Sequence, residues 1–212
     1  MTDGNEKTRA WLTVDRVAAF VDGILAIVIT ILVLGIEVPK DHDFTREGIW
    51  SFLLKTQHDV LVYLLGFILI GVYWLQHHVM WHYIARTDRR FIFQNGLFVF
   101  LLSLSPFVTE FAGEYHEVPV VRALFGVTYL LAGLVFLHMW RYCTARPYLL
   151  RKPIDPEVRR SMTLRILVAP VLILVAIILA FSRFHISALV FLSIPVFYLR
   201  HWLVDTAWRT EE

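Results

Sequence analysis

Apolar residues gather in six long runs that are separated by shorter polar connections. A helix needs about 20 mainly apolar residues to cross the hydrocarbon core of a bilayer, and most of the runs approach or exceed that length. We therefore predict an all-α, polytopic membrane protein in which residues 1–212 form one unit of six transmembrane helices. The expected segments are Val17–Val38, Val60–Trp81, Phe91–Thr109, Val120–Trp140, Ile166–Ser182 and Phe184–Val204.

Basic residues alternate between the two sides that this topology defines. Fifteen of the 20 Lys and Arg residues fall on the N-terminus, the second and fourth connections and the C-terminus. Cytoplasmic loops carry such an excess, so both termini are expected in the cytoplasm. The longest basic connection, Arg141–Arg165, is interpreted as a positive-inside anchor that also touches anionic headgroups. A dedicated regulatory or lipid-binding site is the alternative.

The composition narrows the class of protein further. Hydrophobic residues make up 58% and charged residues 18%, against about 45–50% and about 25% in soluble domains. The single cysteine, Cys143, excludes an intrachain disulfide and provides no metal motif. The sequence has no GxSxG, no glycine-rich phosphate loop and no Cys–His pairing, so we expect no enzyme, no cofactor and no nucleic-acid partner. It also lacks the TVGYG loop of carbonyl-filter potassium channels.

The first apolar run contains an acid, Asp22, well inside the segment, and an ionisable residue inside a span is a candidate functional residue. On a helical wheel Phe20, Ile27, Ile31 and Leu34 form one narrow apolar stripe, and Thr30 flanks it. The acid, Asp22, points about 140° away from Ile27. From spacing alone, such a stripe is more often an ordinary helix-packing surface.

Polar residues of the first three runs are expected at a similar depth. With both termini in the cytoplasm, Asp22, one or both of His77 and His78, and Asn95 all lie one to two turns from the cytoplasmic side, with Trp74 nearby. Polar groups in hydrocarbon must satisfy one another. The layer is interpreted as a hydrogen-bonded brace for the first helix, with a direct role in proton or ion binding as the alternative.

A histidine pair beside an acid also raises the question of a metal. His78 and His82 are four residues apart, as zinc ligands on a helix can be. The sequence has no HExxH, and the fifth run offers no Asp or His. We therefore expect no bound metal, while a proton- or metal-coupled carrier that uses Asp22 and His77/His78 remains the alternative function.

Two motifs stand out in the first half of the chain. The first is Arg16–Asp22, followed by GILAIVITILVL, and the second is Trp74-Leu75-Gln76-His77-His78, with Asp88, Asn95 and Pro106-Phe107 further on. The first resembles the RxxxFSD signature, with Val21 in place of the usual serine, and the second the W-x-x-H-H…D…N…PF run, of the transmembrane protein 175 family. That family comprises the endolysosomal potassium channel and its bacterial homologues. The matches cover the first three helices.

The resemblance implies a potassium-preferring cation channel of a bacterial plasma membrane, with K⁺ and other monovalent cations as its permeant ions. It implies a homotetramer in the lipid bilayer, in which the first helix of each chain lines a central pore. Family pore positions correspond to Ile27, Ile31 and Leu34, with Thr30 beside them, which gives an apolar constriction as gate and filter. The residues expected to form the supporting structural network are Arg16, Phe20, Asp22, Trp74, His77, His78 and Asn95.

Overall fold

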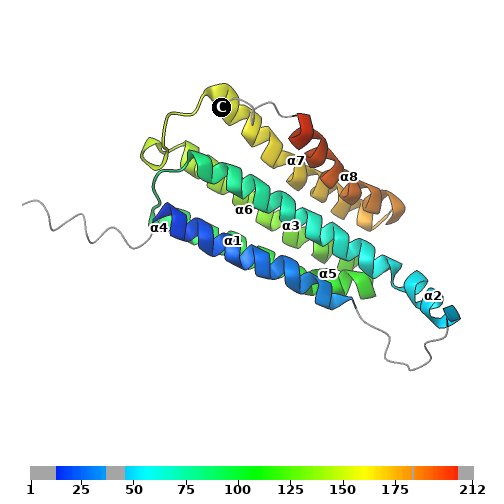
Figure 1. Cartoon of the computed structure of the whole chain (residues 1–212). Coiled ribbons are helices and arrows are strands. Elements are labelled where there is room, and N and C mark those ends of the chain that lie inside the picture. The colour runs from blue at the N-terminus through cyan, green and yellow to red at the C-terminus, as the bar shows by residue number, and fades with distance from the viewer. Residues whose placement is uncertain (1–12, 37–45, 183, 205–212) are drawn as a thin grey trace, which may run out of the picture.

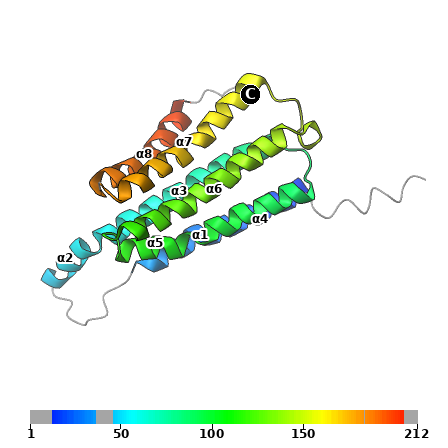
Figure 2. The ribbon, with the colours of Figure 1, turned by 180° about the vertical axis from the view of Figure 1, so that it is seen from behind.

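Long helices lie side by side in a computed structural model that describes residues 13–36, 46–182 and 184–204. Figures 1 and 2 show three tiers, with α7 and α8 on one side, α3 and α6 in the middle, and α1, α4 and α5 on the other side. The elements in chain order are α1 (Val14–Ile31), η2 (Leu32–Gly35), α2 (Arg46–Lys55), α3 (Gln57–Tyr83), α4 (Arg89–Ser103), α5 (Ser105–Glu114), α6 (Pro119–Thr144), η3 (Pro147–Leu149), α7 (Pro156–Ala180) and α8 (Phe184–Val204).

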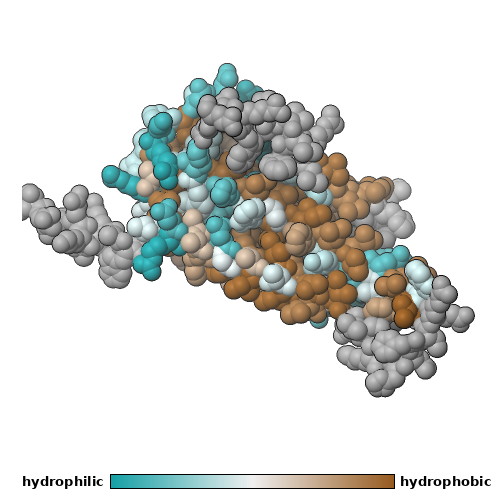
Figure 3. Space-filling model, viewed as in Figure 1, coloured by the Kyte–Doolittle hydropathy of each residue, from teal (hydrophilic) through white to brown (hydrophobic). Residues whose placement is uncertain are grey.

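The predicted all-α membrane fold is confirmed. The six apolar runs are helical over almost all of the residues that the structure describes. The exceptions are Ile36 at the end of η2, Leu104 within the third run, and Phe181 and Ser182 after α7. The end of the first run, residues 37 and 38, falls outside the described residues. Among the described residues, five helical segments are long and apolar enough to cross a membrane, while the apolar part of α8, Leu189–Tyr198, is shorter. In Figure 3 a broad hydrophobic band separates a polar end of the bundle from the region of α2.

The third run differs from its predicted form. We expected one continuous helix over Phe91–Thr109, but the helix breaks at Leu104 and resumes as α5. Pro106 therefore lies in the first turn of a new helix, where its missing N–H has no intrahelical partner to lose. The short helix α2 was not predicted, because its sequence has no long apolar run.

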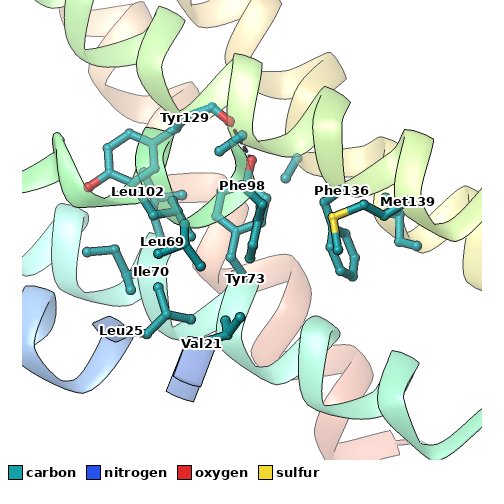
Figure 4. Close-up of a cluster of buried hydrophobic side chains, with 14 of the residues drawn as sticks. Val21, Leu25, Leu69, Ile70, Tyr73, Phe98, Leu102, Tyr129, Phe136 and Met139 are labelled. Atoms are coloured by element: carbon teal, nitrogen blue, oxygen red, sulfur yellow. Dashed lines mark hydrogen bonds between the residues drawn. The ribbon is translucent and has the colours of Figure 1, made fainter. Parts of the chain in front are cut away.

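The core forms where α1, α3, α4 and α6 converge. Figure 4 shows Val21 and Leu25 of α1 facing apolar residues of α3 and α4, and all of these side chains are fully buried. The Tyr73 hydroxyl donates a hydrogen bond of 2.7 Å to the Tyr129 carbonyl oxygen, which ties α3 to α6. A Cβ at Gly133 would lie 2.5 Å from this hydroxyl and 2.8 Å from Pro170 Cγ, so glycine permits the close packing of α3, α6 and α7.

Backbone hydrogen bonds join two connections at one end of the bundle, which we call the basic end. The α3–α4 and α6–α7 connections meet there through an isolated bridge between Ile84 and Leu150. The Ala85 amide donates to the Leu149 carbonyl at 2.8 Å, and the Arg151 amide donates to the Tyr83 carbonyl at 2.9 Å. Connections that are far apart in the chain are thereby fixed to each other.

Candidate functional site

The helix α1 has two apolar faces with different surroundings. One face is buried against α3 and α4 in the same chain, and its residues are at most 6% exposed. The opposite face is uncovered, with Ile27 58% exposed, Ile31 43% exposed and Leu34 76% exposed. The buried face comprises Val17, Val21, Leu25, Val28 and Leu32. The wheel stripe is therefore not a packing surface within the subunit, and we call it the α1 stripe: Phe20, Ile27, Ile31 and Leu34.

Small and polar residues beside the α1 stripe leave that side of the helix open. A Cβ at Gly23 would meet no atom within 4 Å. Thr30 is exposed, and its hydroxyl donates a 2.8 Å hydrogen bond to the Ile27 carbonyl of the preceding turn. Because this hydroxyl is already bonded to its own helix, the surface that α1 presents is largely apolar.

The 3₁₀ turn η2, which follows α1, packs closely against α5. The helix tightens into the 3₁₀ turn η2, and Gly35 closes that turn. A Cβ at Gly35 would lie 3.3 Å from Glu110 Cβ, so a larger residue would push η2 away from α5. The contact between Gly35 and Glu110 therefore helps to position Leu34, the last residue of the α1 stripe.

A polar contact joins α1 to α3 about two turns from the start of α1. The Trp74 indole N–H donates a 3.1 Å hydrogen bond to Asp22 Oδ1. Asp22 is half-buried rather than fully buried in the single chain, and Trp74 is 40% exposed. His78 is also exposed, with its ring 5.9 Å from that of Trp74. Arg16 and Phe20 are exposed in the first turns of the same helix.

The second polar contact lies inside the bundle. His77 is fully buried, and its Nε2 lies 2.9 Å from Asn95 Oδ1 of α4. The Asn95 amide nitrogen donates to the Phe91 carbonyl at 2.8 Å, so both ends of that amide have partners. The Trp81 indole N–H points at the His77 ring from one turn away, and Phe98 stacks on the ring. The expected polar layer is thus divided into a half-exposed Asp22–Trp74 pair and a buried His77–Asn95 pair.

Sequence reasoning missed a third polar cluster, which lies at the basic end. Asp88 caps α4 by accepting a 2.8 Å hydrogen bond from the Phe91 amide. Its Oδ2 also accepts from the Tyr142 hydroxyl at 2.8 Å and from the Tyr148 hydroxyl at 2.7 Å. Burial raises the pKa of Asp88, but these three hydrogen bonds and the charge of Arg146 outweigh it and lower the pKa below its ordinary value. The signal that was available in the sequence was an aspartate directly before a helix, which is typical of an N-cap.

The described part of the chain contains no group of three or more His, Cys, Asp or Glu residues placed to hold a metal ion. His78 and His82, the pair whose spacing suggested zinc, are both exposed on α3. In chemical terms, the described residues offer an uncovered apolar face on α1, and one hydrogen-bonded acid, Asp22, on the side of the same helix that faces α3.

Comparison with known proteins gives consistent matches. Residues 16–106 match the family model described as "Endosomal/lysosomal potassium channel TMEM175". A potassium channel of Chamaesiphon minutus is 32% identical over 186 residues, which cover 86% of this chain and 92% of that protein. The endosomal/lysosomal proton channel TMEM175 of Mus musculus is 25% identical over 201 residues, which are 91% of this chain but 39% of the mouse protein.

A solved structure also matches. The crystal structure of a lysosomal potassium-selective channel TMEM175 homolog from Chamaesiphon minutus superposes with a TM-score of 0.76 at 30% identity. The match covers 89% of this chain and 97% of that chain.

Proposed function

Since this chain belongs to the TMEM175 family of ion channels, we propose that it is the subunit of a homotetrameric, potassium-preferring cation channel in a cell membrane. The two sequence motifs that suggested this family, Arg16–Asp22 and Trp74–His78, both lie within the matched residues 16–106. In this proposal residues 1–212 form one six-helix unit per subunit.

The observation that carries the proposal is the uncovered α1 stripe. One chain supplies one such helix face, and a single helix cannot enclose a path for ions. Closed cyclic assemblies are the usual solution for identical subunits. Four copies would place their α1 stripes around one axis, with Ile27, Ile31 and Leu34 forming successive apolar rings and Thr30 beside them. Mass measurement in mild detergent that gives only monomer, with ion flux retained, would exclude this pore.

Apolar rings provide both a gate and a weak filter. A narrow hydrophobic constriction excludes water when it tightens, which stops ion flow without a moving plug. Ions that pass an open ring must shed part of their water without carbonyl or carboxylate ligands in exchange. Potassium holds its water less tightly than sodium, so it crosses with the smaller penalty, and we expect a modest preference for K⁺.

The supporting residues are proposed to set the angle at which α1 meets the axis. Asp22 and Trp74 tie α1 to α3 through their 3.1 Å hydrogen bond, and His77 and Asn95 tie α3 to α4 inside the bundle. Arg16, Phe20 and His78 belong to the same region and are proposed to complete this network.

The test is bilayer recording of the purified protein with K⁺ on one side and Na⁺ on the other. Ile27→Asn wets the ring and supplies weak ligands, so we expect larger currents and a reversal potential that moves toward equal permeability. Ile178→Asn is the matched control, because Ile178 is 63% exposed on α7, in the tier opposite α1. If Ile27→Asn and Ile31→Asn both leave conductance and ion preference unchanged, the α1 stripe does not line a pore.

The proposed orientation has both termini in the cytoplasm, which places the basic end on the cytoplasmic side. Cysteine labelling tests this in a Cys143→Ser background. A cysteine at position 155, in the α6–α7 connection, should be labelled from inside, and a cysteine at position 42, which lies outside the described residues, from outside. Labelling of both positions from the same side would overturn the six-span topology.

A further inference from the structure

A groove of about 460 Å³ runs along the part of α6 that leads to the basic end. It is lined by two leucines and by a set of cationic and aromatic side chains that continue into the loop after α6. The lining residues are Leu134, Leu137, His138, Arg141, Tyr142 and Arg146. None of these residues takes part in the α1 stripe or in its supporting contacts.

The chemistry of the groove changes along its length. Leu134, which is 44% exposed, and the half-buried Leu137 form an apolar strip on the outward face of α6. One to two turns further on, the exposed His138 and Arg141 continue the same helical face, because positions i, i+3, i+4 and i+7 lie together. One end of the groove is therefore apolar, and the other end is positively charged.

The second cation, Arg146, is held in place by its neighbours. Its Nη1 donates a 3.0 Å hydrogen bond to the Tyr142 carbonyl, and its guanidinium carbon lies 3.6 Å from the centroid of the Tyr142 ring. The Tyr142 hydroxyl is in turn bonded to Asp88, the N-cap of α4. Arg146 is thus pre-positioned at the mouth of the groove, so binding an anion there costs little additional side-chain ordering.

The separation between the apolar and the charged part of the groove is close to the thickness of a membrane interface. Leu134 and Arg141 are seven residues apart, which is about 10 Å along a helix. This is about the distance over which a membrane interface changes from charged headgroups to acyl chains. Three more exposed basic residues lie at the same end of the bundle: Arg86 in the α3–α4 connection, and Arg89 and Arg90 in the first turn of α4.

We propose that this groove binds one anionic phospholipid per subunit. Its phosphate lies between Arg141 and Arg146, and one acyl chain lies along Leu134 and Leu137. Arginine suits this task because its planar guanidinium makes charge-assisted, bidentate hydrogen bonds to phosphate oxygens. Zwitterionic lipids carry a compensating cation, so they bind the same groove more weakly. The site is separate from ion conduction, and it requires only that the chain spans a membrane.

The test is native mass spectrometry of the purified protein in mild detergent with added phosphatidylglycerol or phosphatidylcholine. We expect the wild-type chain to retain phosphatidylglycerol in preference to phosphatidylcholine. Arg141→Gln should weaken phosphatidylglycerol binding by about tenfold, which corresponds to the loss of one charged contact. Arg141→Lys should recover part of it. The control is Arg159→Gln, which removes one exposed charge in the first turn of α7, outside the groove, and should leave binding unchanged.

Three outcomes would overturn the proposal. Equal weakening by Arg141→Gln and Arg159→Gln would mean a general attraction to basic surface and not a site. Equal retention of phosphatidylcholine by the wild-type chain would remove the requirement for an anionic headgroup. Displacement of the lipid by a similar concentration of glycerol phosphate would identify a site for soluble phosphates, in which Leu134 and Leu137 play no part. Because binding is measured without ion flux, these results do not depend on whether the protein conducts.

Discussion

The two faces of α1 have similar composition and different surroundings. Leu25, on one face, is fully buried among residues of α3 and α4, while Ile27, two positions later, is 58% exposed. Both are large aliphatic side chains in a helix of almost continuous apolar sequence. Hydrophobicity therefore does not distinguish a face that holds the subunit together from one that remains available. The difference arises from the packing of distant helices, and it separates residues that stabilise the subunit from those proposed to act in the assembly.

The largest effect on subunit stability is expected from Leu25→Ala. This substitution removes three side-chain carbon atoms from a fully buried site and leaves a cavity. We expect it to lower the free energy of unfolding by about 2–5 kcal/mol. Thermal unfolding in detergent should show a clearly lowered midpoint. Ile27→Ala is the matched control on the other face and should change the stability of the isolated subunit by about 0.5 kcal/mol or less. Equal losses would show that the two faces are equally engaged within one chain.

Adjacent histidines on α3 allow the same comparison for polar residues. His77→Ala leaves the Asn95 side chain without its 2.9 Å partner inside the bundle, which costs about 1–3 kcal/mol. His78→Ala removes an exposed side chain and should stay within about 0.5 kcal/mol. Both variants can be compared by chemical unfolding in the same detergent. A larger loss for His78 would contradict the assignment of His77 as the structural residue.

Asp22 lies between these extremes, because it is half-buried and has an indole donor as its partner. Asp22→Ala removes the acceptor of the Trp74 N–H, and we expect a loss of about 1 kcal/mol in the subunit. If Asp22 sets the angle of α1, the main defect should be a low yield of tetramer on size exclusion, with ion preference unchanged in the tetramer that forms. Normal assembly combined with flux that has lost its coupling to pH or to a metal ion would instead favour a carrier.

The sequence predicted the helices well because membrane spans must be long and apolar wherever they pack. The sequence also predicted that Asp22, Trp74, His77 and Asn95 lie near one another. Successive spans cross the membrane in opposite directions, so the predicted topology places these residues at a similar distance from the cytoplasmic side. The sequence did not predict which of these residues are buried. His77 and His78 are adjacent residues of the same type, but His77 is buried against Asn95 of α4 and His78 is exposed. The Asp88 cluster was missed for a similar reason, since its partners lie 54 and 60 residues away in the chain.

The smallest effect is expected at the basic end, from Asp88→Asn. Asparagine keeps the shape and an N-capping oxygen, so only the charged acceptor of the two tyrosine hydroxyls is lost, which should cost about 1 kcal/mol or less at neutral pH.

The folded-state pKa of Asp88 is lowered, so the carboxylate stabilises the protein above its ordinary pKa, and this stability is lost as the pH falls through the lower, folded-state value. The difference in unfolding midpoint between the wild-type chain and the variant should therefore be present at about pH 7 and shrink toward about pH 3. A difference that stayed constant over this range would show that the charge of Asp88 contributes nothing, and that the cap acts through its shape alone.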